Sequence, residues 1–161
     1  MIKIKIPSAD FMRTAKIWLD YAYAKHGLID AGLIRSYKAA EADFAEWLVM
    51  SVFDGQLPES KSNPGYDVLT QDMRIQVKSV SKMPSNPHGY IVSEKDRKND
   101  RNIGATHYAF VFFNKLIPDV IYLVDEEFVR IFPSKREIKR SDLKEGDCEA
   151  VINIGDFFHP D

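Results

Sequence analysis

The chain has 161 residues, of which 45% are hydrophobic and 29% charged, with a formal net charge of −2 and a single cysteine, Cys148. These values are typical of one globular domain with its own hydrophobic core, and they exclude a disulfide scaffold, a cysteine-rich zinc site and a polycation. No apolar run approaches the roughly 18 residues of a membrane span, and Met1–Pro7 alternates like a strand rather than a signal peptide, so we expect a cytoplasmic protein.

Two helices are predicted in the first third of the chain. Ser8 caps a helix that we expect to run to about Lys25 and to end at His26-Gly27. A second helix is predicted over residues 36–53, followed by a polar loop. The apolar positions of the first helix recur at helical spacing, at Phe11, Ala15, Trp18, Leu19 and Ala22.

Strands are predicted in the rest of the chain. Residues 68–70 and 74–80 resemble a hairpin with a polar turn around Gln71-Asp72. Residues 107–113 form a nearly continuous aromatic and β-branched run, the pattern of a buried central strand. Residues 120–124 are expected to be its neighbour.

The last part of the chain predicts short elements. We expect a turn at Pro118-Asp119 before the strand at 120–124, and Asp125 as the N-cap of a short helix. Residues 149–154 are a candidate late strand. The whole reads as a mixed α/β domain around one central sheet. Its parts would be a helical region over 8–55, a hairpin and sheet over 66–125, and additions over 126–161.

The predicted hairpin gathers polar side chains at one point. Successive side chains alternate across a strand, so Gln76 and Lys78 share one face while Ile75 and Val77 point into the core. The hairpin then brings Asp67, at the start of its first strand, beside that polar face. A carboxylate, an amide oxygen and an ammonium group would converge there.

This combination is typical of phosphodiester hydrolysis assisted by a hard divalent cation. Mg²⁺ is usually held by one or two carboxylates, waters and substrate phosphate, and Asp67 is the candidate carboxylate. Lys78 would stabilise the developing charge or position the attacking water. The alternatives are that Asp67 caps a Pro-Gly-Tyr turn and that Lys78 is an ordinary edge-strand lysine.

Gln76 offers a neutral oxygen where a glutamate would add a charge, so a further acid is expected from the second helix. Glu46 lies beside Ala42, Val49 and Met50 on one apolar flank of that helix, and Glu41 lies on the other stripe. We favour Glu46, and the choice between the two acids stays open at this point.

The residues just described resemble the PD-(D/E)XK nuclease superfamily. The resemblance covers about two-thirds of the chain: the helix with Ala45-Glu46-Trp47-Leu48, the stretch Asn63-Pro64-Gly65-Tyr66-Asp67, Gln76-Val77-Lys78-Ser79, and the strand over 107–113. The glutamine variant is similar to the D…QxK form of Mrr-like restriction nucleases. The resemblance implies a restriction-endonuclease-like fold, a four-stranded mixed sheet flanked by helices.

The resemblance also implies an activity, a Mg²⁺-dependent DNA endonuclease in which Mn²⁺ substitutes. Glu46 and Asp67 would hold the metal with the Val77 carbonyl as a further ligand, Gln76 would complete or orient that shell, and Lys78 would serve the chemical step. We expect a homodimer, because two copies of one site cut two strands most simply. The partner methyltransferase or motor subunit, if any, is not identified by the sequence.

Basic residues cluster on a protein that is neutral overall. Residues 74–101 hold seven Lys or Arg against three acids, and residues 130–144 hold six against two. Such a surface can contact phosphates, although chance clustering on a solvated surface is an equal alternative. The expected DNA contacts are Lys82, Lys95, Arg97, Lys98 and Arg101.

Two other functions remain open. The chain could be an inactive nuclease-fold domain that binds nucleic acid or protein, which Gln76 and the nearly neutral charge both favour. It could also be a junction-resolving or repair nuclease with the same chemistry. The histidines have no metal-ligand spacing and are expected to be structural or incidental: His26, His88, His107 and His159.

Overall fold

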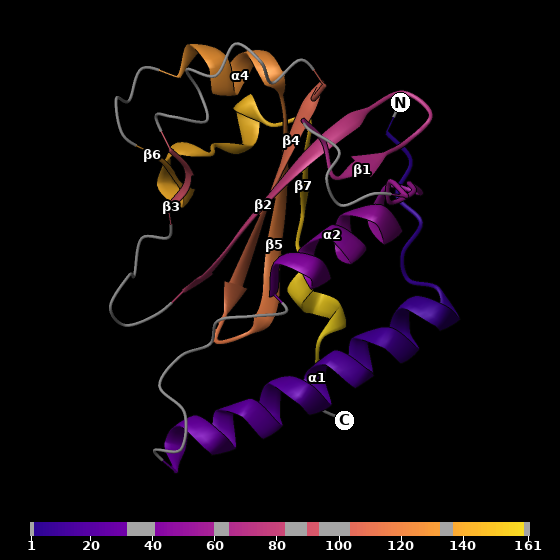
Figure 1. Cartoon of the computed structure of the whole chain (residues 1–161), viewed down its shortest axis with the longest axis vertical. Coiled ribbons are helices and arrows are strands. Elements are labelled where there is room, and N and C mark those ends of the chain that lie inside the picture. Colours follow the sequence, from indigo (N-terminus) through magenta and orange to yellow (C-terminus); the bar gives the residue numbers. More distant parts are fainter. Residues whose placement is uncertain are drawn as a thin grey trace.

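The computed structural model describes residues 2–31, 41–59, 65–82, 90–93, 104–132 and 137–159. Helices flank a five-stranded mixed sheet (Figure 1). The mixed α/β class predicted from the sequence is thereby confirmed. Within the described part, no helix is both long and apolar enough to cross a membrane.

The two helices that precede the sheet are α1 (Ala9–Asp30) and α2 (Glu41–Val52). Ser8 caps α1 as predicted, since its side chain accepts a hydrogen bond from Phe11 N at 3.1 Å. The predicted end at His26-Gly27 was wrong, because α1 continues to Asp30. One internal glycine costs a helix only about 1 kcal/mol relative to alanine, and the last turn still forms its backbone hydrogen bonds. The predicted start of the second helix, at residue 36, lies outside the described residues.

Five strands make the central sheet. In spatial order they are β1 (Val68–Leu69), β2 (Arg74–Lys82), β4 (His107–Asn114), β5 (Ile117–Asp125) and β7 (Ala150–Ile152). Strands β2 and β4 run parallel, and the other neighbours run antiparallel. The predicted hairpin is β1–β2, with Val68 opposite Ile75, and the predicted late strand is β7. The sheet thus has one strand more than the four-stranded core that the resemblance implied.

Each face of the sheet has its own core, because side chains of β4 alternate between them. Ala109, Val111 and Phe113 pack with α1, α2, Ile75 and Val77. Tyr108, Phe110 and Phe112 pack on the other face with α4 (Glu126–Ile131) and with β6 (Glu137–Lys139), which pairs with β3 (Tyr90–Ser93). Figure 1 shows α2 on one side of the sheet and α4 beside the end of β5, where β4 begins.

The turn between β4 and β5 differs from the prediction at Pro118-Asp119. It lies at Lys115 and Leu116, which adopt positive φ values of 48° and 70°. Leu116 is fully buried, and its carbonyl accepts a hydrogen bond from Trp18 Nε1 at 2.6 Å. Burial and this contact outweigh the usual preference for glycine or asparagine at positive φ. Pro118 lies within β5, beyond the residues that pair with β7.

The predicted cap after β5 is confirmed. The Asp125 side chain accepts a hydrogen bond from Phe128 N at 2.8 Å at the start of α4. Three short 3-10 helices complete the described chain: η1 (Arg140–Asp142), η2 (Glu145–Asp147) and η3 (Ile154–Phe157).

Candidate active site

Asp67 occupies the position just before β1, where the hairpin fixes its backbone. Its N–H donates to the carbonyl of Ile75 on β2 at 2.9 Å, which extends the pairing of Val68 with Ile75 by one step. The tight turn of the hairpin is closed at its other end by Thr70, whose hydroxyl oxygen accepts from Met73 N at 2.9 Å. Asp67 is therefore held at the open end of β1, as the sequence predicted.

The backbone just before Asp67 packs closely against the segment that begins at Gly104. Gly65 has a φ of 109°, which side-chain-bearing residues rarely adopt, and a Cβ there would lie 3.1 Å from Gly104 N. Gly104 in turn packs against the ring of Tyr66, and its carbonyl accepts from the Arg74 guanidinium. Two chain segments thus meet backbone to backbone beside the carboxylate.

The carboxylate of Asp67 reaches β2 through one oxygen. Oδ2 accepts a hydrogen bond from Gln76 Nε2 at 2.5 Å and another from Val77 N at 2.8 Å. Because an ionised carboxylate only accepts, the chemistry fixes the Gln76 amide with its NH₂ toward Asp67 and its oxygen away. Gln76 therefore orients Asp67, and Oδ1 makes no hydrogen bond within the described part of the chain.

The charge on Asp67 is in part desolvated. Burial raises the pKa of this carboxyl above its ordinary value, while the Val77 hydrogen bond, the Lys78 ammonium and the Gln76 amide lower it. The net direction is upward, so burial outweighs the three groups that favour the anion. A further cation beside Asp67 would lower this pKa and favour the anion.

The faces of β2 agree with the predicted alternation. Ile75 and Val77 are buried in the core shared with α2, so Gln76 and Lys78 project from the opposite face. Lys78 is partly buried and close enough to act electrostatically on Asp67. The structure thus brings Asp67, Gln76 and Lys78 together.

The Val77 carbonyl also points toward this group. In an extended strand, the N–H and C=O of one residue face the same neighbouring strand. Since Val77 N–H reaches Asp67, the Val77 carbonyl faces the same edge of β2, where β1 has already ended. A backbone oxygen is therefore available beside the carboxylate.

The two helix acids occupy different surroundings. Glu46 is partly exposed on α2, and it is not among the described groups that hydrogen-bond to Asp67 or shift its pKa. Glu41 is buried at the start of α2, and its Oε1 has no hydrogen-bond partner within the described residues. Burial raises the pKa of Glu41, and the nearby Lys25 ammonium on α1 lowers it. Glu41 thus belongs to the packing of α1 on α2.

The predicted DNA contacts fall largely outside the described residues. Lys82 is the last residue of β2. Lys95, Arg97, Lys98 and Arg101 lie in the stretch between residues 93 and 104 that the structure does not describe. Their role stays a prediction.

The donor set fits a hard cation that takes most of its ligands from elsewhere. The described residues contain no group of three or more His, Cys, Asp or Glu side chains able to hold a metal. The oxygens at hand are Asp67 Oδ1 and the Val77 carbonyl, to which waters and a substrate phosphate would be added. Mg²⁺ tolerates such a sparse protein shell, whereas zinc usually has three or four protein ligands.

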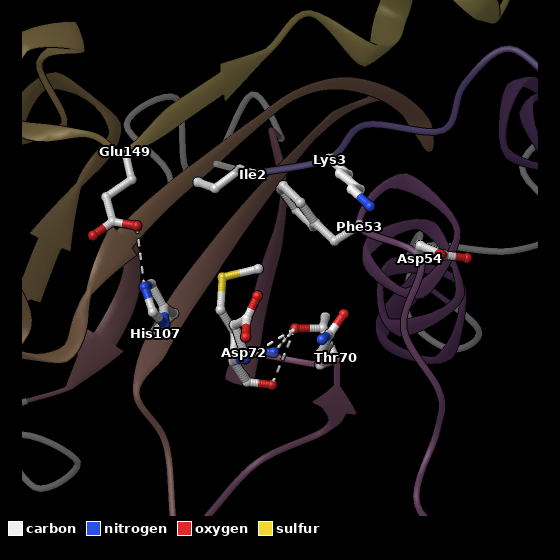
Figure 2. A pocket seen from close by; sticks show the side chains of 10 residues that line it. Ile2, Lys3, Phe53, Asp54, Thr70, Asp72, His107 and Glu149 are labelled. Carbon is white, nitrogen blue, oxygen red and sulfur yellow. Dashed lines mark hydrogen bonds and ion pairs between the residues drawn. The ribbon is translucent and has the colours of Figure 1, made fainter.

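A hollow of about 280 Å³ at the hairpin turn is the other candidate (Figure 2). On one wall, His107 Nε2 lies 3.1 Å from Glu149 Oε2, and His107 Nδ1 lies 2.8 Å from the Thr106 hydroxyl oxygen. The Thr70 hydroxyl oxygen likewise accepts hydrogen bonds from the backbone of its own turn, from Asp72 N and Met73 N. Both nitrogens of His107 are therefore used within the protein, and the pair joins the start of β4 to Glu149. This agrees with a structural histidine, and no local sequence signal could have paired residues so far apart.

Comparison with known proteins adds no relative to this picture. The chain matches none of the protein-family models, and it matches no curated protein. The assignment of function therefore depends on the geometry around Asp67.

Proposed function

We propose that this protein is a metal-dependent DNA endonuclease, restriction-enzyme-like, that hydrolyses phosphodiester bonds. The observation that carries the proposal is the convergence of Asp67, Gln76 and Lys78 at the open end of β1. A partly desolvated carboxylate with a free oxygen, an orienting amide and an adjacent ammonium are the groups that phosphoryl chemistry needs.

Mg²⁺ is the proposed cofactor, with Mn²⁺ as a substitute. Asp67 Oδ1 and the Val77 carbonyl would hold it, with Glu46 as the second acid. When bound, the ion would neutralise charge on the phosphate and lower the pKa of a water molecule that it binds. The partial burial of Asp67 supports this assignment, because burial raises the pKa of its carboxyl and a bound cation would favour the anion again.

The residues of the chain itself have separate tasks. Gln76 and Val77 N–H hold Oδ2, so the free oxygen of Asp67 keeps one orientation. Lys78 carries a positive charge to the same point, where it stabilises the negative charge that develops on the phosphoryl oxygens or positions the attacking water.

DNA would be held by dispersed basic residues: Lys82, Lys95, Arg97, Lys98 and Arg101. One small domain carries one such site, so a duplex cut calls for two subunits related by a two-fold axis. A junction-resolving or repair nuclease would use the same residues on another DNA structure.

An inactive binding domain is the second candidate. It is favoured by the neutral Gln76, and by the lack, among the described residues, of any group of three or more His, Cys, Asp or Glu side chains that could hold a metal. In that case the hydrogen bonds to Asp67 would serve only to close the end of β1.

The deciding experiment compares two matched variants in a cleavage assay on DNA with Mg²⁺ or Mn²⁺. Asp67→Asn keeps an acceptor for Val77 N–H and loses the charge, so we expect cleavage to fall by at least about 10²-fold with the fold intact. Asp72→Asn makes the same change on the exposed hairpin turn and should leave cleavage unchanged. A wild type that binds no divalent ion and cuts no DNA would establish the binding domain instead.

A further inference from the structure

Arg74 projects from the same face of β2 as Gln76 and Lys78. Ile75, which separates Arg74 from Gln76, is fully buried, so strand alternation places these two side chains on the side away from it. In the hairpin, Arg74 pairs with Leu69 of β1, which is 41% exposed. Arg74 is itself exposed. Its guanidinium therefore lies on the surface beside the candidate active site, and the sequence did not predict it as a DNA contact.

A backbone carbonyl holds the guanidinium of Arg74 in this place. Arg74 Nε donates a hydrogen bond to the carbonyl oxygen of Gly104. Gly104 packs against Gly65 and the Tyr66 ring, immediately before Asp67, so the guanidinium is attached to the segments that position the carboxylate. Its two terminal NH₂ groups make no hydrogen bond within the described part of the chain. These donors are available to a ligand, on a side chain whose orientation is already set.

The charge of Arg74 is not compensated by a carboxylate. The other arginines that the structure describes each form an ion pair: Arg13 with Asp10, Arg130 with Glu126 and Glu127, and Arg140 with Asp119. Among the described residues, no acid pairs with Arg74. Its charge is also not among the causes that shift the pKa of Asp67, whereas the charge of Lys78 is. A positive group that is exposed, held and uncompensated attracts an anion.

The chemistry of the guanidinium and its place on the strand favour a phosphate as this anion. Its planar donors match two phosphate oxygens at once, which an ammonium group cannot do. Arg74 and Lys78 are four residues apart, about 13 Å along a strand. A substrate that contacts both residues therefore carries more than one phosphate group, as a polynucleotide does.

We propose that Arg74 binds, through its terminal NH₂ groups, a phosphodiester next to the one that is cleaved at Asp67 and Lys78. This inference rests on the proposed function, because it takes the substrate to be DNA. Arg74 holds the strand so that the cleaved phosphate meets Asp67 and Lys78 in one orientation, and it takes no part in breaking the bond.

Binding and cleavage are measured separately, so the failures of the two proposals are distinguishable. A wild type that binds DNA through Arg74 and cuts none contradicts the proposed function and leaves the phosphate contact standing. A wild type that cuts DNA no better than Arg74→Gln does contradicts the contact and leaves the chemistry of Asp67 standing.

The first test measures binding to duplex DNA by fluorescence anisotropy, without divalent ions. We expect Arg74→Gln to bind about tenfold more weakly than the wild type, the scale of one charge-assisted contact. Arg130→Gln is the matched control, because it removes the same charge from an arginine that pairs with Glu126 and Glu127. The control should lose less than about twofold. An equal loss in both variants, or no loss in Arg74→Gln, would overturn the proposal.

Arg74→Lys separates the charge from the contact with Gly104. Lysine keeps the positive charge and lacks the Nε–H, so it should recover part of the affinity that Arg74→Gln loses. If Arg74→Lys recovers none of that affinity, Arg74 serves only to join β2 to Gly104, and the phosphate contact is refuted.

The second test locates the contact on the DNA strand. Once the cut is mapped, a neutral methylphosphonate replaces one phosphate at a time on either side of it, and single-turnover cleavage is measured. At the contacted phosphate, the wild type should slow about tenfold while Arg74→Gln slows little, because its side of the contact is already missing. Equal slowing of the two proteins at both neighbouring phosphates would contradict the proposal.

Discussion

At the scale of single residues, Asp67 is the point where local and long-range structure meet. Its carboxylate accepts two hydrogen bonds from β2 through one oxygen and faces a lysine charge. For Gln76, the structure distinguishes between the two roles that the sequence allowed. The sequence allowed it to be a ligand or an orienting group, and the amide that points its NH₂ at Asp67 makes it an orienting group in this structure.

The residue-scale prediction is that Asp67 variants lose metal binding, whereas Lys78 variants bind the metal and lose turnover. Asp67→Ala removes a carboxylate ligand, so Mg²⁺ binding should weaken and cleavage should fail even at raised Mg²⁺. Lys78→Ala leaves the oxygens in place, so Mg²⁺ should still bind while turnover falls about 10²–10⁴-fold, the usual scale for one positioned catalytic group. Calorimetric titration paired with single-turnover cleavage measures both effects. Equal loss of Mg²⁺ binding in the two variants would contradict these roles.

At the scale of elements, the contact of α1 with α2 contains a buried acid. Trp18 stacks on Phe44 with ring centroids 3.9 Å apart, and Glu41 lies in the same contact beside Lys25. Glu41 Oε1 has no hydrogen-bond partner within the described residues. A buried polar atom without a partner costs about 1–3 kcal/mol, so this helix pair is less stable than its apolar contacts alone would make it.

The element-scale prediction concerns pH. Burial raises the folded-state pKa of Glu41 above its ordinary value of 4.5. The folded protein then holds this proton more tightly than the unfolded chain does, so the free energy of unfolding should decrease as pH rises from about 4.5 through the raised pKa. Glu41→Gln cannot titrate, and it should lose less stability over that range than the wild type. Denaturant unfolding at several pH values measures the difference.

Glu46→Gln is the matched control for this experiment. Because Glu46 is partly exposed whereas Glu41 is buried, the same substitution at Glu46 should change the stability less, while showing the loss of cleavage expected of a second metal acid. A loss of cleavage in Glu41→Gln but not in Glu46→Gln would show that the other helix acid serves the site.

At the scale of the whole molecule, charge is distributed unevenly on a chain with a net charge of −2. A protein that is not a polycation can bind DNA only through a local basic surface. Binding of that kind releases counterions from the phosphates that the basic residues contact, and it therefore weakens as salt rises.

The whole-molecule prediction is a salt dependence set by the proposed contacts. Five contacts, Lys82, Lys95, Arg97, Lys98 and Arg101, predict a slope of about −4 to −5 for log K against log salt on duplex DNA. Lys95→Ala/Lys98→Ala should reduce the magnitude of this slope by about 2. Lys3→Ala/Lys16→Ala, which removes the same charge near the N-terminus, should leave it unchanged. Fluorescence anisotropy across a salt series makes the comparison, and equal slopes for both double variants would contradict the assignment.

Local sequence patterns were enough to predict much of the fold and of the candidate site. The alternation of Gln76 and Lys78 with Ile75 and Val77 is a property of one strand, so the sequence was enough to predict which side chains share a face. The caps at Ser8 and Asp125 were predictable for the same reason, because each depends on a neighbour three residues away. The convergence on Asp67 followed from the hairpin.

Contacts between segments far apart in the sequence could not be predicted from local patterns. The turn at Lys115 and Leu116 is decided by the burial of Leu116 against the helical layer, not by turn propensity. The pairing of His107 with Glu149 joins positions 42 residues apart, and no local pattern connects them. The different surroundings of Glu41 and Glu46 likewise depend on how α1 packs against α2.

The sequence by itself determined the α/β class, the hairpin and the choice of Asp67, Gln76 and Lys78, because strand alternation and turn chemistry act over a few residues. Only the tertiary structure decided that one oxygen of Asp67 is held by Gln76 and Val77 and that Glu41 is buried. Those outcomes depend on which surfaces of distant segments meet, and the burial of apolar area, rather than local propensity, selects among them.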